Sequence, residues 1–122
     1  MKYLGILLLL VAAMSTEAPM SASNDTYHFG PATFKTEFWI NNKAVFKKPK
    51  NVNVEFVTAG AFDWVIANSS GHEVKTVRHK NEHGGWTGID FASLGLYQDY
   101  SIGFRNASGN EQEIKQGDVE MR

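Results

Sequence analysis

Residues 62–79 read FDWVIANSSGHEVKTVRH. Apolar side chains occupy every second position from Phe62 to Ile66, which is the period of a β-strand with one buried face. Residues 68–71 are Asn-Ser-Ser-Gly, a typical turn composition, and residues 73–79 can form a return strand. The segment therefore predicts an antiparallel hairpin. Val65 is apolar too, which predicts that the first strand is central in its sheet and covered on both faces.

The rest of the chain also favours strands. The period of two recurs in residues 34–40, 52–56 and 100–104. A further strand is expected at 86–91, and two short ones within 111–122. No stretch of ten or more residues has apolar side chains at helical spacing. The sequence therefore predicts an all-β domain, a single β-sandwich of seven to eight short antiparallel strands or a small barrel.

Two details resemble immunoglobulin-like domains of the fibronectin-III type. Leu94 precedes Tyr100 by six residues, and Tyr100 opens an alternating strand, which is similar to the tyrosine corner of such sandwiches. The resemblance implies that the Tyr100 hydroxyl bonds to the backbone a few residues upstream. Trp64, in the middle of a predicted buried strand, is similar to their core tryptophan. The resemblance implies an Ig-like β-sandwich. The alternation itself predicts that Phe38, Val54, Trp64, Tyr100 and Ile102 face inward together.

A second resemblance covers one hairpin. Residues 60–68, GAFDWVIAN, followed by Gly-His-Glu-Val at 71–74, resemble the strand–turn–strand hairpin of BsuPI-type proteinase inhibitors. That family consists of cysteine-free, immunoglobulin-like sandwiches. The resemblance implies a proteinase-inhibitor-like function as one alternative for this chain.

The N-terminal residues have the composition of a signal peptide. Lys2 precedes an apolar run over residues 4–14, and small residues follow at 18–23. Eleven helical residues rise only about 16 Å, roughly half the thickness of the bilayer's hydrocarbon layer. We expect a signal peptide over 1–23, a mature domain over 24–122 and no stable membrane insertion after cleavage. Cleavage is expected near Ala22 or Ser23, with residues 13–15 as the alternative site, whereas an uncleaved anchor would need a longer apolar span.

Charge and cysteine content exclude several classes of protein. The 122 residues contain 12 Lys and Arg against 13 Asp and Glu, a net charge of −1, which argues against nucleic acid as a partner. The chain has no cysteine, which excludes a disulfide scaffold, a cysteine nucleophile and a thiolate metal site. Because disulfide-free export is commoner in Gram-positive bacteria, we expect a secreted, extracellular bacterial protein.

One cluster of charge stands out in the sequence. It consists of four lysines, Lys43, Lys47, Lys48 and Lys50. These lysines could attract an anionic cell-surface or cell-wall component, or an acidic patch on an extracellular protein. Alternatively, they are a solvated loop that, together with Pro49, discourages pairing between sheet edges.

Two tryptophans and two histidines are further candidates for binding. Trp39 is predicted to lie on the face opposite the phenylalanines, and Trp86 follows two glycines at the edge of a loop. Exposed tryptophans stack on sugars or anchor protein interfaces, unless neighbouring strands cover them. His79 and His83 are four residues apart, a spacing that aligns two metal ligands on a helix but not on a strand. We therefore expect solvated loop histidines and no metal site.

These observations favour a non-enzymatic binding or interaction module of unknown ligand, with no cofactor. The alternative is a secreted proteinase-inhibitor-like or antimicrobial-type effector that acts through residues 79–87. An enzyme is disfavoured because no Gly-x-Ser-x-Gly or paired-carboxylate motif is present. We expect the binding surface to comprise the loops at 43–50 and 79–86.

Overall fold

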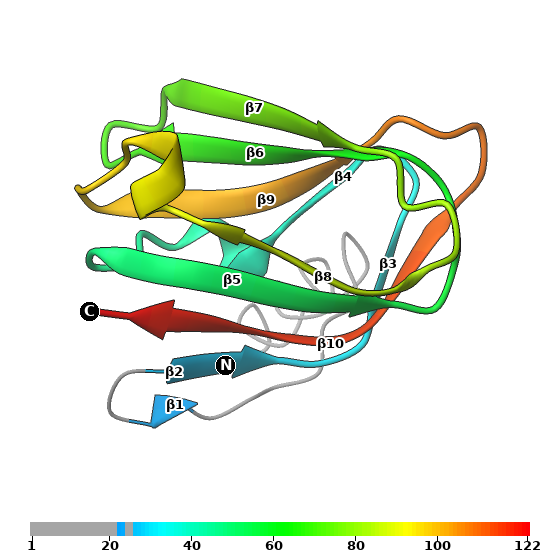
Figure 1. The fold of residues 1–122 in the computed structure, drawn as a ribbon, viewed down its shortest axis with the longest axis horizontal. Coiled ribbons are helices and arrows are strands. Elements are labelled where there is room, and N and C mark those ends of the chain that lie inside the picture. Colours follow the sequence, from blue (N-terminus) through cyan, green and yellow to red (C-terminus); the bar gives the residue numbers. More distant parts are fainter. Residues whose placement is uncertain (1–21, 24–25) are drawn as a thin grey trace, which may run out of the picture.

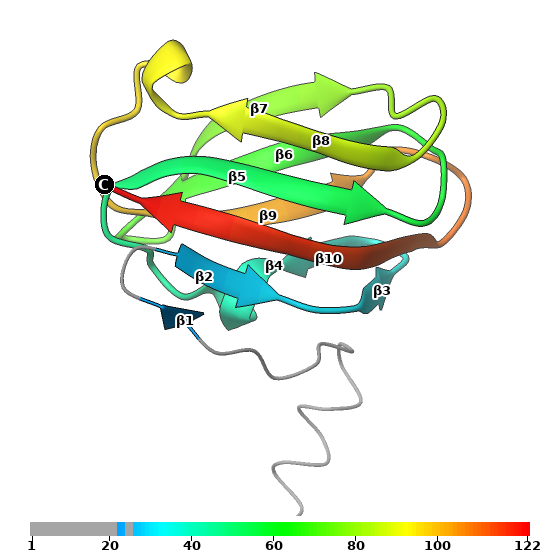
Figure 2. The same cartoon turned by 60° about the horizontal axis from the view of Figure 1, so that its bottom comes forward.

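The computed structural model describes residues 22–23 and 26–122. The predicted signal peptide lies outside the described residues, except for the two at 22–23. Ten strands of the described part form two antiparallel sheets that face each other (Figures 1 and 2). The fold class predicted from the sequence, a two-sheet antiparallel sandwich, is confirmed.

The elements are as follows. The first sheet contains, in spatial order, β1 (Ala22–Ser23), β2 (Thr26–Phe29), β10 (Gln112–Met121), β5 (Pro49–Phe56) and β8 (Gly85–Asp90), and β3 (Ala32–Phe34) extends it by pairing with β10. The second sheet contains β4 (Glu37–Trp39), β9 (Tyr100–Asn106), β6 (Phe62–Asn68) and β7 (Glu73–His79). Two short 3₁₀ helices, η1 (Ile40–Lys43) and η2 (Ala92–Leu94), lie in the connections. Neither helix in the described part of the chain has the length or apolar character needed to cross a membrane.

The connectivity differs from that of an immunoglobulin domain. In a constant-type immunoglobulin sandwich, three pairs of consecutive strands each lie within one sheet. Here the chain crosses to the opposite sheet after β3, β4, β5, β7, β8 and β9, and within the described residues β6–β7 is the one long hairpin. This order is that of an eight-stranded jelly roll. The immunoglobulin resemblance thus extends to the sandwich architecture but not to the order of the strands.

Two segments depart from the predicted strands. Residues 34–40 are not one strand, because Phe34 pairs with Gln112 in the first sheet whereas Phe38 pairs with Phe104 in the second. The chain crosses between the sheets at residues 35–36. The rings of Phe34 and Phe38 still both face the core, with 6.2 Å between their centroids, so the alternation of buried side chains continues across the crossing. The C-terminal segment is one ten-residue strand, β10, because a register shift at 114–116 lets it continue.

The core lies between the sheets and is rich in aromatic rings. Trp64 is 1% exposed and packs against Phe104 at 4.9 Å between ring centroids, and Phe56 stacks on Phe62 at 4.6 Å. All five residues predicted to face inward are buried in this one cluster: Phe38, Val54, Trp64, Tyr100 and Ile102. That prediction is confirmed.

Tyr100 makes the contact expected of it. Its hydroxyl oxygen accepts a hydrogen bond from the backbone N–H of Gln98 at 3.2 Å. Its ring stacks on Phe91, with 5.8 Å between centroids, and Leu94 packs against the same core. The predicted bond from this tyrosine to the upstream backbone is confirmed, although the surrounding strand order is that of a jelly roll.

Candidate functional site

The connecting loops gather at the two opposite ends of the sandwich. Phe56 pairs with Gly85, and Asn51 pairs with Asp90 at the other end of the same two strands. The β7–β8 loop therefore lies at one end, whereas residues 43–50, which lead into β5, lie at the other (Figure 1). The two loops predicted to share a binding surface are not brought together.

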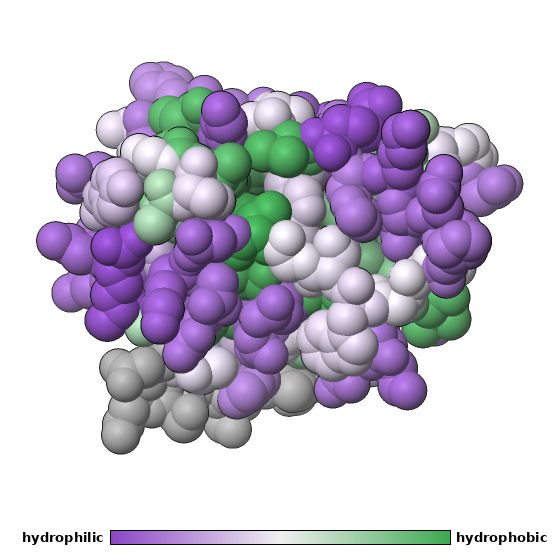
Figure 3. Space-filling view, in the orientation of Figure 1, coloured by the Kyte–Doolittle hydropathy of each residue, from purple (hydrophilic) through white to green (hydrophobic). Residues whose placement is uncertain are grey.

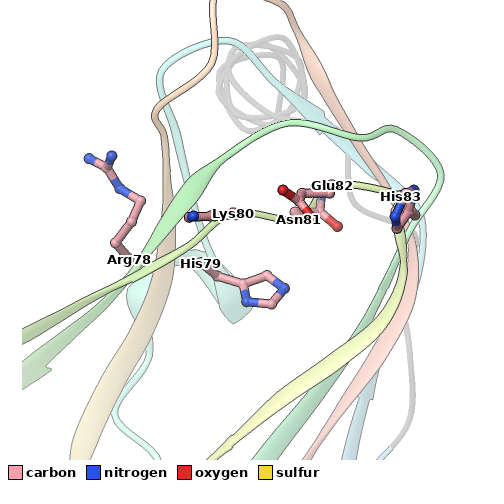
Figure 4. A pocket seen from close by; sticks show the side chains of 7 residues that line it. Arg78, His79, Lys80, Asn81, Glu82 and His83 are labelled. Atoms are coloured by element: carbon pink, nitrogen blue, oxygen red, sulfur yellow. The ribbon is translucent and has the colours of Figure 1, made fainter.

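The β7–β8 loop curls round an open hollow of about 510 Å³. Residues 78–84 line it (Figure 4). The structure thus brings His79 and His83 to one site. His79 is half-buried, and its ring meets the edge of Phe62 with 5.3 Å between centroids. His83 is exposed.

Asn81 anchors this loop to the body of the domain. Its side chain is 4% exposed, and its Nδ2 group donates hydrogen bonds to the carbonyl oxygens of Thr58 at 3.1 Å and Gly60 at 3.2 Å. The backbone N–H of Gly60 in turn donates to the carbonyl oxygen of Asn81 at 2.9 Å. Asn81 has a φ of 50°, a left-handed conformation that asparagine tolerates better than most residues. Nothing in the local sequence distinguishes this asparagine from an ordinary loop residue.

A second set of hydrogen bonds ties in the β9–β10 loop. The Thr58 hydroxyl donates to Oε1 of Gln112 at 2.8 Å, and Nε2 of Gln112 donates to the Ser108 hydroxyl at 3.1 Å. Gln112 is completely buried. Gly60 must be glycine here, because a Cβ would lie 2.4 Å from Nε2 of Gln112. Three loops at this end therefore form one braced unit.

The polar side chains around the hollow differ in how they are engaged. Arg78 directs its guanidinium away from His79, and it pairs with Asp63 on the outer face of the second sheet (Figure 4). This pairing raises the pKa of Arg78. Within residues 26–122, the side chains of Lys80, Glu82 and His83 take part in no hydrogen bond or ion pair. They are available to a ligand.

The described residues offer no obvious place for a metal ion. Among them, no group of three or more His, Asp or Glu side chains is arranged to hold one. The side chains that line the hollow carry two imidazoles, one carboxylate, one ammonium group and one guanidinium group.

Trp86 is the most exposed tryptophan, at 56%. It pairs with Glu55, which alternates with the buried Val54 and Phe56, so Trp86 faces outward from the first sheet. Val57, 55% exposed, follows at the same end of β5. Trp86 and Val57 thus expose apolar side chains at the end of the sandwich where the β7–β8 loop lies.

Trp39 is covered rather than free. Its ring lies on Gly103, where a Cβ would be 2.7 Å from Cδ2, and the Lys43 ammonium lies 4.5 Å from its centroid on the outer face. Its Nε1 donates to Glu37 at 2.8 Å. The alternative given for this tryptophan, coverage by neighbouring segments, describes what is found.

Side chains on the outer face of the second sheet also cover Val65, which is 1% exposed. Arg105 reaches across the sheet and donates from Nη2 to Oε2 of Glu73 at 2.6 Å, and its Nε lies 3.5 Å from Oε1 of Glu37. The bond to Glu73 raises the pKa of Arg105 and lowers the pKa of Glu73. The prediction that β6 is a central strand covered on both faces is therefore confirmed.

The other lysines remain on the surface. Lys47, Lys48 and Lys50 are exposed. The backbone N–H of Lys48 donates to Asp99, and its carbonyl oxygen accepts from Arg122, which places this segment beside the C-terminus. It carries charge but lies far from the hollow.

Partly buried apolar residues show at the side of the sandwich. β7 and β8 are edge strands of their sheets, and their inward residues Val77 and Ile89 pack against the core. Apolar surface is visible among polar side chains on the face seen in Figure 3.

Comparisons with known proteins were made by sequence and by structure. No family model matches the chain, and no curated protein matches it, so the BsuPI resemblance has no support from these comparisons. A Streptococcus pneumoniae fucose binding module is similar in structure, with a TM-score of 0.53 and 15% identity, over 88% of this chain and 90% of that one. A Drosophila melanogaster CENP-C cupin domain has a TM-score of 0.38 and 12% identity, over 93% of this chain and 92% of that one. The likeness to the fucose binding module is one of fold alone.

Proposed function

We propose that this domain is a non-enzymatic carbohydrate-binding module whose ligand occupies the hollow at residues 78–84, with Trp86 beside it as a stacking surface. The observation that carries the proposal is the hollow itself, which is open, braced by Asn81 and lined by polar side chains without partners in the described chain. A site that is ordered before the ligand arrives loses less entropy on binding.

The likeness to a fucose binding module supports this function by analogy. The two chains share an architecture over most of their lengths. Because one fold hosts many functions, the argument depends on the residues at the loop end. Exposed tryptophan and hydrogen-bonding groups at one edge are the combination that a sugar requires, since its ring has an apolar face and a polar rim.

The inhibitor hypothesis has less support. An inhibitory loop is held extended, whereas Asn81, Gly84 and Gly85 all have positive φ angles and curl the β7–β8 loop. We propose no catalytic role either, because residues 78–84 include no hydroxyl nucleophile and one carboxylate.

Binding of the mature domain to a glycan array, followed by calorimetry on the strongest ligand, tests the proposal. We expect Trp86→Ala to weaken binding about tenfold or more through faster dissociation, as for a desolvated aromatic anchor. Tyr97→Ala is the matched control, because Tyr97 is 52% exposed but lies in the β8–β9 connection at the opposite end. Equal effects of the two substitutions would place the site elsewhere.

Lys47 and Lys48 provide a second comparison. Neutralising both should leave glycan affinity unchanged, because they lie at the other end of the sandwich. Should they instead attract an anionic wall polymer or protein, their loss would slow association and weaken its salt dependence. That result, with Trp86→Ala silent, would favour the lysine cluster as the binding surface.

We also propose that the domain acts outside the cell, after export from a Gram-positive bacterium and removal of residues 1–23. The short apolar run over residues 4–14 and the small residues after it support this location. Intact-mass measurement on protein from the culture medium tests it. A secreted protein that retains Met1–Met14 would contradict cleavage.

A further inference from the structure

We infer that the hollow receives an acidic sugar unit, carrying a carboxylate or a sulfate, and that protonation of His79 and His83 strengthens its binding. This inference rests on the proposed function and specifies its ligand class. It follows from which charged groups line the hollow and which of them are already engaged.

The permanently charged groups cancel. Arg78 is paired with Asp63, and Lys80 is offset by Glu82, the one acid that lines the hollow. The Nδ2 group of Asn81 is used inward on two backbone carbonyls, and this buried side chain adds no charge to the hollow. The two imidazoles therefore set the sign of the local potential.

The surroundings of the two imidazoles add few other charged groups. His79 packs on the uncharged ring of Phe62. The braced loop at 57–61 has no titratable side chain, and the loop at 107–111 has one, the exposed Glu111. Histidine is the side chain that ordinarily gains charge between about pH 8 and 5. With both imidazoles protonated the hollow would carry an excess of positive charge, whereas with both neutral its charges balance.

The groups that remain free then favour an anion both by their charge and by the number of hydrogen-bond donors among them. His79, Lys80 and His83 all donate hydrogen bonds when protonated, and Glu82 alone among the free groups accepts. A sugar carboxylate or sulfate supplies several acceptor oxygens and a negative charge. A neutral sugar gains the hydrogen bonds but not the electrostatic attraction.

The test is a glycan array in matched pairs, read at pH 7.5 and pH 5.5. Uronate oligosaccharides are paired with their methyl esters, and sulfated oligosaccharides with their desulfated forms. We expect the acidic member of a pair to bind better and to bind about tenfold more tightly at pH 5.5, the effect of two nearby charges in a solvated site. Comparison of the uronate and sulfate pairs shows which anion the hollow receives.

Variants assign the pH effect to the hollow. His79→Gln with His83→Gln should abolish the tightening, and His83→Gln alone, at an exposed position, should reduce it without affecting the fold. His72→Gln is the matched control, because His72 is exposed in the β6–β7 turn at the opposite end. We expect this control to retain the full effect.

The outcomes separate the two proposals. Binding of neutral members alone, without pH dependence, would overturn the inference and leave the carbohydrate function standing. A pH effect that survives the double variant would also overturn it. Absence of glycan binding at both pH values would overturn the function together with the inference.

Discussion

The side-chain amide of Asn81 donates to the carbonyl oxygen of Thr58 at 3.1 Å, across 23 residues of sequence. This bond joins the β7–β8 loop to the β5–β6 loop. It links two loops rather than two strands, so a substitution at Asn81 tests the loop end without removing a core side chain.

Asn81→Ala should lower the free energy of unfolding by about 1–3 kcal/mol, because two partly buried carbonyl oxygens lose their donor. It should also weaken glycan binding by loosening the loop. Asn42→Ala is the control, since Asn42 has a similar φ of 54° but an exposed side chain. Urea denaturation of both variants gives the comparison, and equal costs would mean that backbone strain alone accounts for the loss.

Trp64→Ala should cost roughly 3–5 kcal/mol, comparable to the whole stability of a small domain, because it leaves a large cavity among packed aromatic rings. The variant should be unfolded or melt far below the wild type. Trp86→Ala, at an exposed position, should change stability by less than about 0.5 kcal/mol. A folded Trp64→Ala variant with an unchanged melting temperature would contradict the assigned core.

Tyr100→Phe should lower stability by about 1 kcal/mol, since the N–H of Gln98 loses the hydroxyl oxygen it bonds to. Tyr97→Phe serves as the comparison, because the Tyr97 hydroxyl is exposed and its bond to Ala92 is 3.3 Å long. Thermal melting of the two variants should separate them. Identical melting curves would argue against a structural role for the Tyr100 hydroxyl.

Gly103→Ala should destabilise the domain by about 1–3 kcal/mol, because the new methyl group would displace the Trp39 ring from the sheet. A change in tryptophan fluorescence should accompany the loss. Gly109→Ala is the matched substitution, as a Cβ there meets nothing within 4 Å. If Gly103→Ala is as stable as Gly109→Ala, the ring is not seated on the glycine.

The ion pair of Glu73 with Arg105 should make stability depend on pH in acid. The bond from Arg105 lowers the folded-state pKa of Glu73 below its ordinary value of 4.5. The stabilisation is therefore fully present above about pH 4.5 and is lost as the pH falls through the lower, folded-state pKa. Because both side chains are partly exposed, the effect is small, about 0.2–1 kcal/mol.

Chemical denaturation of the wild type and Glu73→Gln at pH 7 and pH 3 measures this effect. We expect the wild type to be more stable at pH 7 and the difference to shrink at pH 3. A difference that persists unchanged in acid would mean that the carboxylate charge is not its source.

The candidate site was partly visible in the sequence. His79, His83 and Trp86 were singled out from one polar, glycine-containing segment, and they do lie at one loop end. Asn81 was not, because an asparagine that holds a loop and one that faces water look alike until the partner carbonyls are located. The lysines at 43–50 are expected on the same binding surface because they supply charge, but no local pattern links the two loops in space, and strand pairing places them at opposite ends.

Local periodicity determined which side chains are buried. Phe38, Val54 and Trp64 face inward because successive side chains of an extended chain point to opposite faces. This holds whatever strand lies beside it. The jelly-roll order, the corner at residues 35–36 and the bracing of Asn81 against Thr58 arise from contacts between segments far apart in the chain. No local pattern encodes such pairing, since many partners satisfy the same alternation. The packing of the whole core selects one of them.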